Sequence, residues 1–333
     1  MRIKELIRAN HQAFTEKYAN RLLPSHRKAL DAILACRSQC GEFYTQCDHC
    51  HKHTSIPLSC GHRSCPQCQN HLSRIWLERQ KQKLLPVNYF LVTFTIPEQL
   101  RSLVWEHQTI MYDLLFKASI EAIQTIGRNN HQVELGATGV LHTHKRDKGY
   151  HPHVHFIVPG GGVIIDGNRR SWKTLGQKFL VNEQALACVF RGILLRRIFE
   201  AQDDLDSGHE LKLPAGLPRK WVTNISSVGR GEKALEYLAR YLYRGVISEN
   251  DVFTDGHGQV VYRYRESKTN TMITTKAYPE DFLWRIIQHV LPRGFRRVRD
   301  YGFLHANSKR LLMQVQLLLK VKLRRREQPR PWP

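Results

Sequence analysis

Apolar residues recur with helical spacing in several parts of the chain. In "HRKALDAILAC", Leu30, Ile33 and Leu34 share one face of a helix, and Pro24 suits its first turn. Residues 1–35 are therefore predicted to be helical. The same spacing predicts helices over the charged segment 70–85, from about Leu103 to Ile126, over 177–201, from about Gly231 to Tyr243 and over 279–291.

Short runs rich in β-branched and aromatic residues predict strands between these helices. "VNYFLVTFTI" is such a run and ends at Pro97. Further strands are predicted in 134–144, 148–158, 220–226 and 259–267. The glycines 160–162 and "DGNRR" predict a loop, and the charged, proline-containing segment 202–219 predicts a linker. The chain is thus expected to mix helices and strands rather than to belong to a single class.

The charge of the chain indicates a polyanionic partner. Its 333 residues contain 51 Lys and Arg against 29 Asp and Glu, a formal net charge of +22. Clustered cations gain affinity for nucleic acid because they release counterions from phosphates. The N-terminus lacks the apolar core of a signal peptide, and no stretch approaches the roughly 20 apolar residues that span a bilayer. We therefore expect a cytoplasmic, nucleic-acid-binding protein.

The strand "KGYHPHVHFIVPGGG" carries two histidines on one face. Side chains alternate along a strand, so Val154 and Phe156 face one side while His153 and His155 face the other. The two imidazoles then project from α-carbons roughly 6.6 Å apart, a spacing that lets both bind one cation. A pair of hydrogen-bonded histidines on a half-exposed strand fits the same pattern.

A third ligand would favour the metal site. "LHTHKRD" precedes this strand by a hairpin-length connection and contains His142 and His144. His142 is the preferred third ligand. His151 is the rival, because it is close in sequence to the histidine pair.

The segment "RGEKALEYLARYLYRG" predicts a helix with two distinct faces. Its apolar face contains Leu235, Leu238 and Leu242. Its basic stripe contains Lys233, Tyr237, Arg240, Tyr241 and Arg244. Two phenols one turn apart, flanked by guanidinium groups that hold phosphate charge, are suited to attack on phosphodiesters. Tyrosines with this spacing also occur where they merely pack against a neighbouring element.

Seven of the eight cysteines fall between residues 36 and 68. Such crowding without a secretion signal indicates metal binding rather than disulfides. Cys47-x-x-Cys50 and Cys65-x-x-Cys68 are separated by 14 residues, which is close to zinc-ribbon spacing. These four thiolates are the predicted ligands of a structural Zn²⁺.

The other cysteines of this region have less definite roles. Cys60 and His62 are alternatives, either replacing one of the four ligands or helping to bind a second ion. Cys36 and Cys40 are predicted to be packed cysteines at a helix end. The two Cys-x-x-Cys motifs are surrounded by histidines, Lys52 and Arg63. This region is therefore predicted to contact DNA, and a zinc site with a purely structural role is the alternative.

The C-terminal segment is strongly basic and contains interleaved aromatic residues. In "PRGFRRVRDYGF", Arg296 and Arg297 lie beside Phe295, Tyr301 and Phe303. Cations that hold phosphates and rings that stack on bases are the two parts of a single-strand binding surface. These arginines are therefore predicted DNA contacts.

Together, these motifs resemble the HUH superfamily of single-strand DNA endonucleases. Within it, the chain is similar to the rolling-circle transposases of bacterial insertion sequences of the type numbered ninety-one. The matching stretches, in family order, are "CDHC…SCGHRSCPQCQ", "YFLVTFTIPEQLR", "LHTHKRDKGYHPHVHFIVPGGG", "YLARYLYR" and "LPRGFRRVRDYGFL". They extend from about residue 20 to residue 310.

The resemblance implies an α+β fold, with helices packed on an antiparallel sheet whose central strand carries the metal histidines. The expected domains are an N-terminal helical segment (1–35), a zinc-binding domain (36–85), an HUH nuclease core (86–250) and a basic C-terminal region (251–333).

The resemblance also implies a DNA transposase that nicks and joins single strands at transposon ends. Mg²⁺ or Mn²⁺ held by His142, His153 and His155 would polarise the scissile phosphate, and Tyr237 or Tyr241 would form a 5′-phosphotyrosine. Lys233, Arg240, Arg244, Arg296 and Arg297 would contact single-stranded DNA and hairpin ends.

Three other functions fit parts of the sequence. A replication initiator or relaxase would share the chemistry but act on plasmid DNA. A non-enzymatic zinc-ribbon regulator would use the histidines and tyrosines only for packing. A metal-dependent phosphodiesterase would activate water and leave no strand attached to protein.

Overall fold

The computed structural model describes residues 2–68, 70–176, 182–203, 211–242, 247–266 and 269–322. The chain forms two compact units, each assembled from three segments. The first unit contains Met1–Arg74, His142–Pro152 and Ala239–Phe295, and the second contains Ile75–Leu141, His153–Leu238 and Arg296–Pro333. The expected divisions near residues 35, 85 and 250 stay predictions, because these units group residues by contact rather than by order along the chain.

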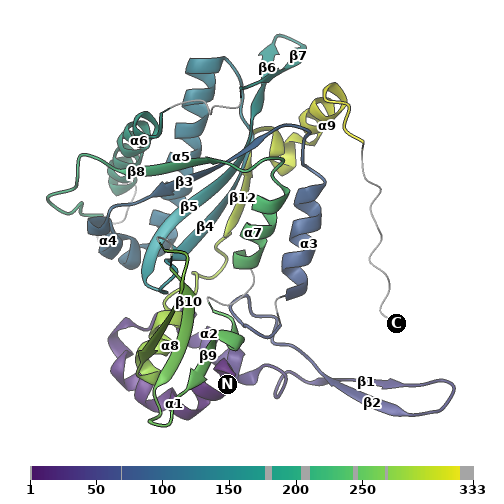
Figure 1. The fold of residues 1–333 in the computed structure, drawn as a ribbon, viewed down its shortest axis with the longest axis vertical. Coiled ribbons are helices and arrows are strands. Elements are labelled where there is room, and N and C mark those ends of the chain that lie inside the picture. Colours follow the sequence, from purple (N-terminus) through teal and green to yellow (C-terminus); the bar gives the residue numbers. More distant parts are fainter. Residues whose placement is uncertain are drawn as a thin grey trace. The chain divides into compact units, whose positions relative to one another are not determined.

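The predicted mixture of helices and strands is confirmed (Figure 1). The helices are α1 (Ile3–Lys17), α2 (Pro24–Ala35), α3 (Asn70–Lys81), α4 (Arg101–Glu106), α5 (Gln108–His131), α6 (Glu183–Asp203), α7 (Glu232–Leu242), α8 (Pro279–Ile287) and α9 (Lys309–Leu318). The strands are β1 (Glu42–Gln46), β2 (His53–Pro57), β3 (Tyr89–Thr95), β4 (Ala137–His144), β5 (Tyr150–Pro159), β6 (Gly161–Asp166), β7 (Arg169–Thr174), β8 (Val222–Ser227), β9 (Val252–Thr254), β10 (Val260–Arg265), β11 (Met272–Ala277) and β12 (Val298–Tyr301). Among the described residues, none of the helices combines the length and the apolar composition of a membrane span.

The largest sheet has five strands in the order β12-β4-β5-β3-β8. One of its faces is apolar because alternate residues of β3 and β5 are large and hydrophobic. Phe94 and Phe156 are fully buried there and meet edge to face at 5.9 Å. Phe116 of α5 and Phe190 of α6 pack on these rings, so α5 and α6 cover this face. The polar residues of the same strands therefore lie on the opposite face.

The C-terminal part of the chain completes this sheet, which the sequence did not predict. β12 pairs antiparallel with β4, with Val298 opposite Val140. Asp300 accepts hydrogen bonds from Thr138 of β4 at 2.7 Å and from Lys83 at 2.6 Å. The strand was missed because it is only four residues long and two of them are charged, so its partner rather than its own pattern defines it.

Two predicted elements differ from the structure. The loop expected after residue 160 is the hairpin β6–β7, whose strands pair from Gly161 opposite Thr174 to Asp166 opposite Arg169. Gly161 is needed because a Cβ there would overlap the ring of Trp172, and the turn uses Gly167 at φ +51°. The long helix expected from Leu103 is divided into α4 and α5 at His107, which has non-helical torsion angles.

The first unit has a separate core built from helices α1, α2 and α8. Tyr18 of α1 stacks on Trp284 of α8 with ring centroids 4.8 Å apart. Strands β9, β10 and β11 form a three-stranded sheet, and Tyr262 of β10 packs on Phe282 of α8. A two-stranded ribbon, β1–β2, belongs to the same unit.

Candidate functional site

The polar face of β3 and β5 carries the histidine pair. The strand register places Thr93 opposite His155 and Thr95 opposite His153. The two imidazoles lie with ring centroids 4.8 Å apart, and the Nδ1 atom of His155 lies 2.8 Å from the Thr93 hydroxyl. The apolar side chains that alternate with the histidines along β5 are buried, as the sequence pattern predicted; they are Val154, Phe156 and Val158. The histidines therefore share the face that is not used for core packing.

Burial determines the charge of His155. Only 9% of the residue is exposed, and this desolvation, together with the nearby charge of His153, lowers the pKa of His155 well below its usual value. Its imidazole is therefore neutral at neutral pH. The neutral ring is the form that binds a metal ion, and a contact at Nδ1 leaves Nε2 as the nitrogen that can do so.

His142 of β4, the preferred third ligand, and its rival His151 both belong to the first unit, whereas His153 and His155 belong to the second. The choice between His142 and His151 therefore stays a prediction. The two imidazoles of β5 have the donor type that a divalent metal ion takes.

The part of helix α7 that belongs to the second unit is held there by a glycine, two leucines and two salt bridges. Gly231 precedes the helix at φ +83°, where a Cβ would overlap the ring of Tyr89 in β3. Leu235 and Leu238 are buried, as the helical pattern predicted. Lys81 of α3 forms salt bridges with Glu232 at 3.1 Å and with Glu236 at 3.2 Å. These contacts determine which face of α7 is turned toward the sheet.

Tyr237 lies on the remaining face of α7, and its ring is next to that of His155. Its ring centroid is 6.4 Å from that of His155, and the two rings are nearly perpendicular, at 86°. The residue is 38% exposed, so its phenol is accessible from solvent. A candidate nucleophile and a candidate metal ligand are thus neighbours within one unit.

The remaining predicted DNA-contact residues are only partly described. Lys233 and Arg296 are exposed, and Arg297 is half-buried, with its carbonyl oxygen accepting a hydrogen bond from the Leu141 N–H. The side chains of Arg240 and Tyr241 and the whole of Arg244 lie outside the described residues.

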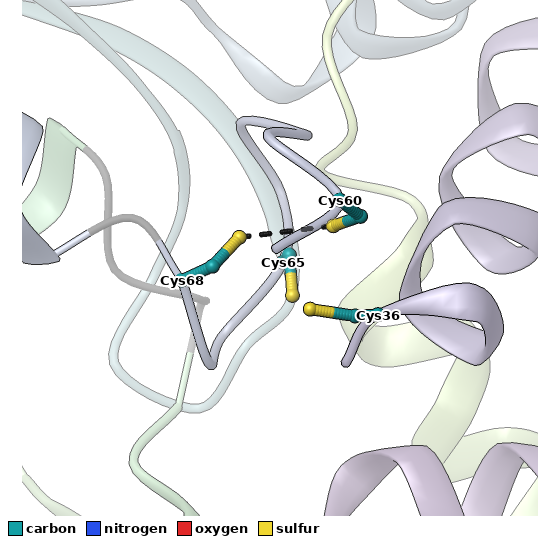
Figure 2. A group of neighbouring side chains, drawn as sticks. All are labelled: Cys36, Cys60, Cys65 and Cys68. Atoms are coloured by element: carbon teal, nitrogen blue, oxygen red, sulfur yellow. Dashed lines mark hydrogen bonds between the residues drawn. The ribbon is translucent and has the colours of Figure 1, made fainter. Parts of the chain in front are cut away.

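A second group of potential ligands lies in the first unit and contains four cysteines (Figure 2). Cys36 caps the C-terminus of α2, while Cys60, Cys65 and Cys68 come from the loop that follows β2. All four sulfur atoms lie within 4.8 Å of one another, and those of Cys60 and Cys68 are 3.7 Å apart. A tetrahedral site with Zn–S bonds of about 2.3 Å requires sulfur atoms about 3.8 Å apart. The four cysteines therefore fit a structural zinc ion.

Burial favours the protonated form of two of these thiols. Burial raises the pKa of Cys60 to about 12, and burial raises the pKa of Cys65 as well. Both thiols would therefore be neutral when no cation is bound. A bound dication supplies the charge that keeps buried cysteines as thiolates, which are the ligands of zinc.

This cluster matches the predicted zinc ligand set only in part, and that set stays a prediction. Cys65 and Cys68 are in the cluster, and so is the alternative ligand Cys60, but Cys47 and Cys50 are not. They lie exposed at the turn that connects β1 to β2. Cys36, expected to be a packed cysteine, replaces them because the loop after β2 returns to the end of α2. Ligand spacing alone identified both Cys-x-x-Cys motifs, but it could not show that only the second of them belongs to the cluster.

We expect the substitution Cys60→Ser to remove the zinc of this cluster. A neutral hydroxyl is a poor replacement for a thiolate, so bound zinc should fall by about one equivalent per chain. The melting temperature should fall with it, by about 2–4 °C for each kcal/mol of lost stability. Metal analysis and thermal melting measure both effects.

Cys40→Ser is the matched control. Its Sγ donates to the Ala35 carbonyl at 3.3 Å, a bond that a serine hydroxyl preserves, and it is not in the cluster. Zinc content should not change. Loss of a full equivalent in Cys47→Ser, with none in Cys60→Ser, would instead support the ligand set predicted from spacing.

Sequence reasoning missed three residues that shape these sites. Thr93 contacts His155, and its signal is the polar alternation "TFT" in an otherwise apolar strand. Gly231 allows α7 to approach Tyr89, and no local pattern distinguishes it from an ordinary glycine before a helix. Cys36 completes the cysteine cluster, and only its crowding with the other cysteines pointed to it.

Comparison with known proteins adds independent information. A family model described as "Putative transposase" matches residues 136–311, and one described as "Transposase zinc-binding domain" matches residues 6–96. The chain is 31% identical over 322 residues to "Putative transposase y4qJ" of Sinorhizobium fredii, a match that covers 91% of this chain and 80% of the relative. It is 26% identical over 260 residues to "Transposase for insertion sequence element IS801" of Pseudomonas savastanoi pv. phaseolicola, covering 74% of this chain and 61% of the relative. No solved structure matches the chain.

Proposed function

The chain belongs to the family of IS91-type transposases with an N-terminal zinc-binding domain, and from this premise we propose that it cuts and rejoins single-stranded DNA through a tyrosine-linked intermediate. The observation that carries the proposal is the position of Tyr237 beside His155. The proposed substrates are the single-stranded and hairpin-forming ends of the transposon. The high positive charge of the chain supports a nucleic-acid substrate.

In this proposal His153 and His155, with His142 as the third ligand, would hold Mg²⁺ or Mn²⁺. Such an ion would neutralise charge on a scissile phosphate and orient it for in-line attack. The neutral state of His155 supports its role as a ligand, because a protonated imidazole has no lone pair for a metal. The contact at Nδ1 with Thr93 orients the ring.

The proposed chemical step is a transesterification at phosphorus. The phenol of Tyr237 loses its proton to solvent or to a nearby base, and its oxygen forms a bond to the scissile phosphorus. The bond from phosphorus to the 3′-oxygen breaks, and that oxygen takes up a proton as a 3′-hydroxyl. A free phenol has a pKa of about 10, so this attack depends on a site that assists deprotonation.

The covalent link makes rejoining independent of ATP. A phosphotyrosine is still a phosphodiester, so a new 3′-hydroxyl can displace the tyrosine without an external energy source. A second tyrosine, for which Tyr241 is the candidate, would permit two linked strand transfers. Lys233 and Arg296 are exposed cations that can hold the DNA backbone during the reaction.

The test is to incubate the full-length protein with a labelled single strand from an element end and Mn²⁺. We expect a protein–DNA adduct that survives denaturation, that EDTA prevents, and that mass spectrometry maps to the peptide containing Tyr237 or Tyr241. Cleavage that releases two free ends and never labels the protein would show hydrolysis by water instead. DNA binding with neither cleavage nor adduct would favour a regulator.

The substitution Thr93→Val tests how His155 is oriented. Valine has nearly the same shape but cannot contact Nδ1, so the imidazole loses the partner that holds its orientation. Loss of such a supporting contact typically costs 10- to 100-fold in metal affinity or activity. We expect the Mn²⁺ concentration for half-maximal cleavage to rise by about that factor.

Thr95→Val is the control for this substitution. Thr95 is on the same face of β3, opposite His153, so the change in shape and polarity is the same. Its metal requirement should match that of the unmodified protein. Equal shifts in both variants would show that the sheet, and not the contact with His155, had been perturbed.

A further inference from the structure

The pair Cys47 and Cys50 is not explained by the nuclease or by the four-cysteine cluster. Both lie at the turn of the ribbon β1–β2 and are exposed. The turn is closed by hydrogen bonds from the His51 N–H to the Cys47 carbonyl at 2.8 Å and from the Cys47 N–H to the Lys52 carbonyl at 3.0 Å. Both thiols therefore leave from one tight turn at the outer end of the ribbon, with the spacing of a zinc knuckle.

The ribbon has little to stabilise it within its own chain. All ten residues of β1 and β2 are exposed, including Phe43, Tyr44 and Ile56. An isolated two-stranded hairpin is at best marginally stable in water. In Figure 1 the ribbon extends away from α1, α2 and α8, the helices of its own unit. A metal ion at the turn would tie the two strands together at the end where they are least supported.

The turn supplies only half of a tetrahedral zinc site. Zinc bound for structural purposes takes four ligands, and Cys47 and Cys50 provide two. Among the described residues, no third cysteine, histidine or carboxylate lies within 4.8 Å of this pair. The nearby His51 has positive φ, +53°, and its Nδ1 faces the side chain of Gln46 at 3.4 Å. Completing the site within one chain would require this turn to rearrange.

We propose that the missing ligands are Cys47 and Cys50 of a second copy of this chain, so that one Zn²⁺ joins two ribbons end to end. A two-fold axis through the ion makes the contact self-complementary, because each copy contributes the same two thiolates. Residues 47–52 contain one acidic and one basic side chain, Asp48 and Lys52, besides the cysteines and histidines. Two such turns therefore bring no excess of acidic or of basic side chains to the contact. This zinc-bridged contact between two ribbons, called the joint below, does not depend on the nuclease reaction.

Metal stoichiometry gives a direct test, because a shared ion contributes half an equivalent per chain. The full-length protein, purified with zinc in the presence of a phosphine reductant, should contain about 1.5 Zn²⁺ per chain and have the mass of a dimer. One equivalent belongs to the four-cysteine cluster and one half to the joint. The double variant Cys47→Ser, Cys50→Ser should contain 1.0 Zn²⁺ per chain and be a monomer. Light scattering after size-exclusion chromatography and metal analysis measure these quantities.

Two further measurements distinguish the joint from its alternatives. Cys188→Ser removes another exposed cysteine, on α6, and should change neither zinc content nor mass. X-ray absorption should show sulfur as the only zinc ligand. A monomer with 2.0 Zn²⁺ per chain, or with nitrogen ligands, would show that histidines complete the site within one chain and would overturn the proposal. So would a content of 1.0 in the unmodified protein, or a dimer that persists in the double variant.

Discussion

Replacing Tyr237 and Tyr241 together by phenylalanine is expected to abolish the covalent protein–DNA adduct. Phenylalanine preserves the ring and its packing but removes the oxygen that would bond to phosphorus. Removal of a nucleophile commonly costs several powers of ten in rate, and here we expect at least roughly 1,000-fold. Binding of the single strand should change little, because the cations that hold phosphates are untouched.

The single variant Tyr237→Phe distinguishes the two tyrosines. Tyr237 is the one whose ring meets His155, so its loss should remove the first adduct, while Tyr241→Phe should leave one cleavage step intact. Quantitative denaturing gels with labelled DNA measure each adduct. Tyr278→Phe is the control, because Tyr278 is an exposed tyrosine before α8 and is not part of this group. Undiminished adducts in the double variant would disprove the assignment of the nucleophile.

Replacing His153 or His155 by alanine is expected to remove metal-dependent cleavage. Each substitution takes away one imidazole of the pair on β5, and the remaining ligands would hold a dication weakly. We expect cleavage to fall at least roughly 100-fold at a Mn²⁺ concentration that saturates the unmodified protein. Cleavage rates across a Mn²⁺ titration, and Mn²⁺ binding followed by electron paramagnetic resonance, measure the effect.

Measuring Mn²⁺ binding together with thermal melting distinguishes a variant that has lost the metal site from one that has lost its fold. His155 is buried on the sheet, so His155→Gln, which preserves volume and polarity, should accompany His155→Ala. Both should melt as cooperatively as the unmodified protein while binding Mn²⁺ weakly. His257→Ala, in an exposed turn, is the control and should retain full activity. If His153→Ala and His155→Ala cleave normally in EDTA, the proposed metal site is wrong.

The pH dependence of the reaction should reflect the burial of His155. Burial lowers the pKa of this imidazole, so the ring stays neutral as the pH falls through the range in which an exposed histidine gains a proton. The same shift means that His155 destabilises the folded protein below the usual pKa of histidine, because the unfolded chain binds a proton that the folded site resists. The contribution of His155 to metal binding should therefore persist to lower pH than that of an exposed imidazole.

The sequence alone determined features that depend on short-range periodicity. Alternation along a strand identified the face shared by His153 and His155, because successive side chains of any β-strand point to opposite sides. Helical periodicity likewise separated Leu235 and Leu238 from Tyr237. Both results come from the covalent geometry of the backbone, which neighbouring elements do not change.

Tertiary structure decided which of these features meet. Tyr237 lies beside His155, 82 positions away, because Gly231 and the bridges from Lys81 orient α7, and no local pattern encodes those contacts. Likewise, the return of the loop after β2 to the end of α2 places Cys36, and not Cys47 or Cys50, with Cys65 and Cys68. Ligand spacing identifies residues that can bind a metal, but the path of the chain decides which of them share one.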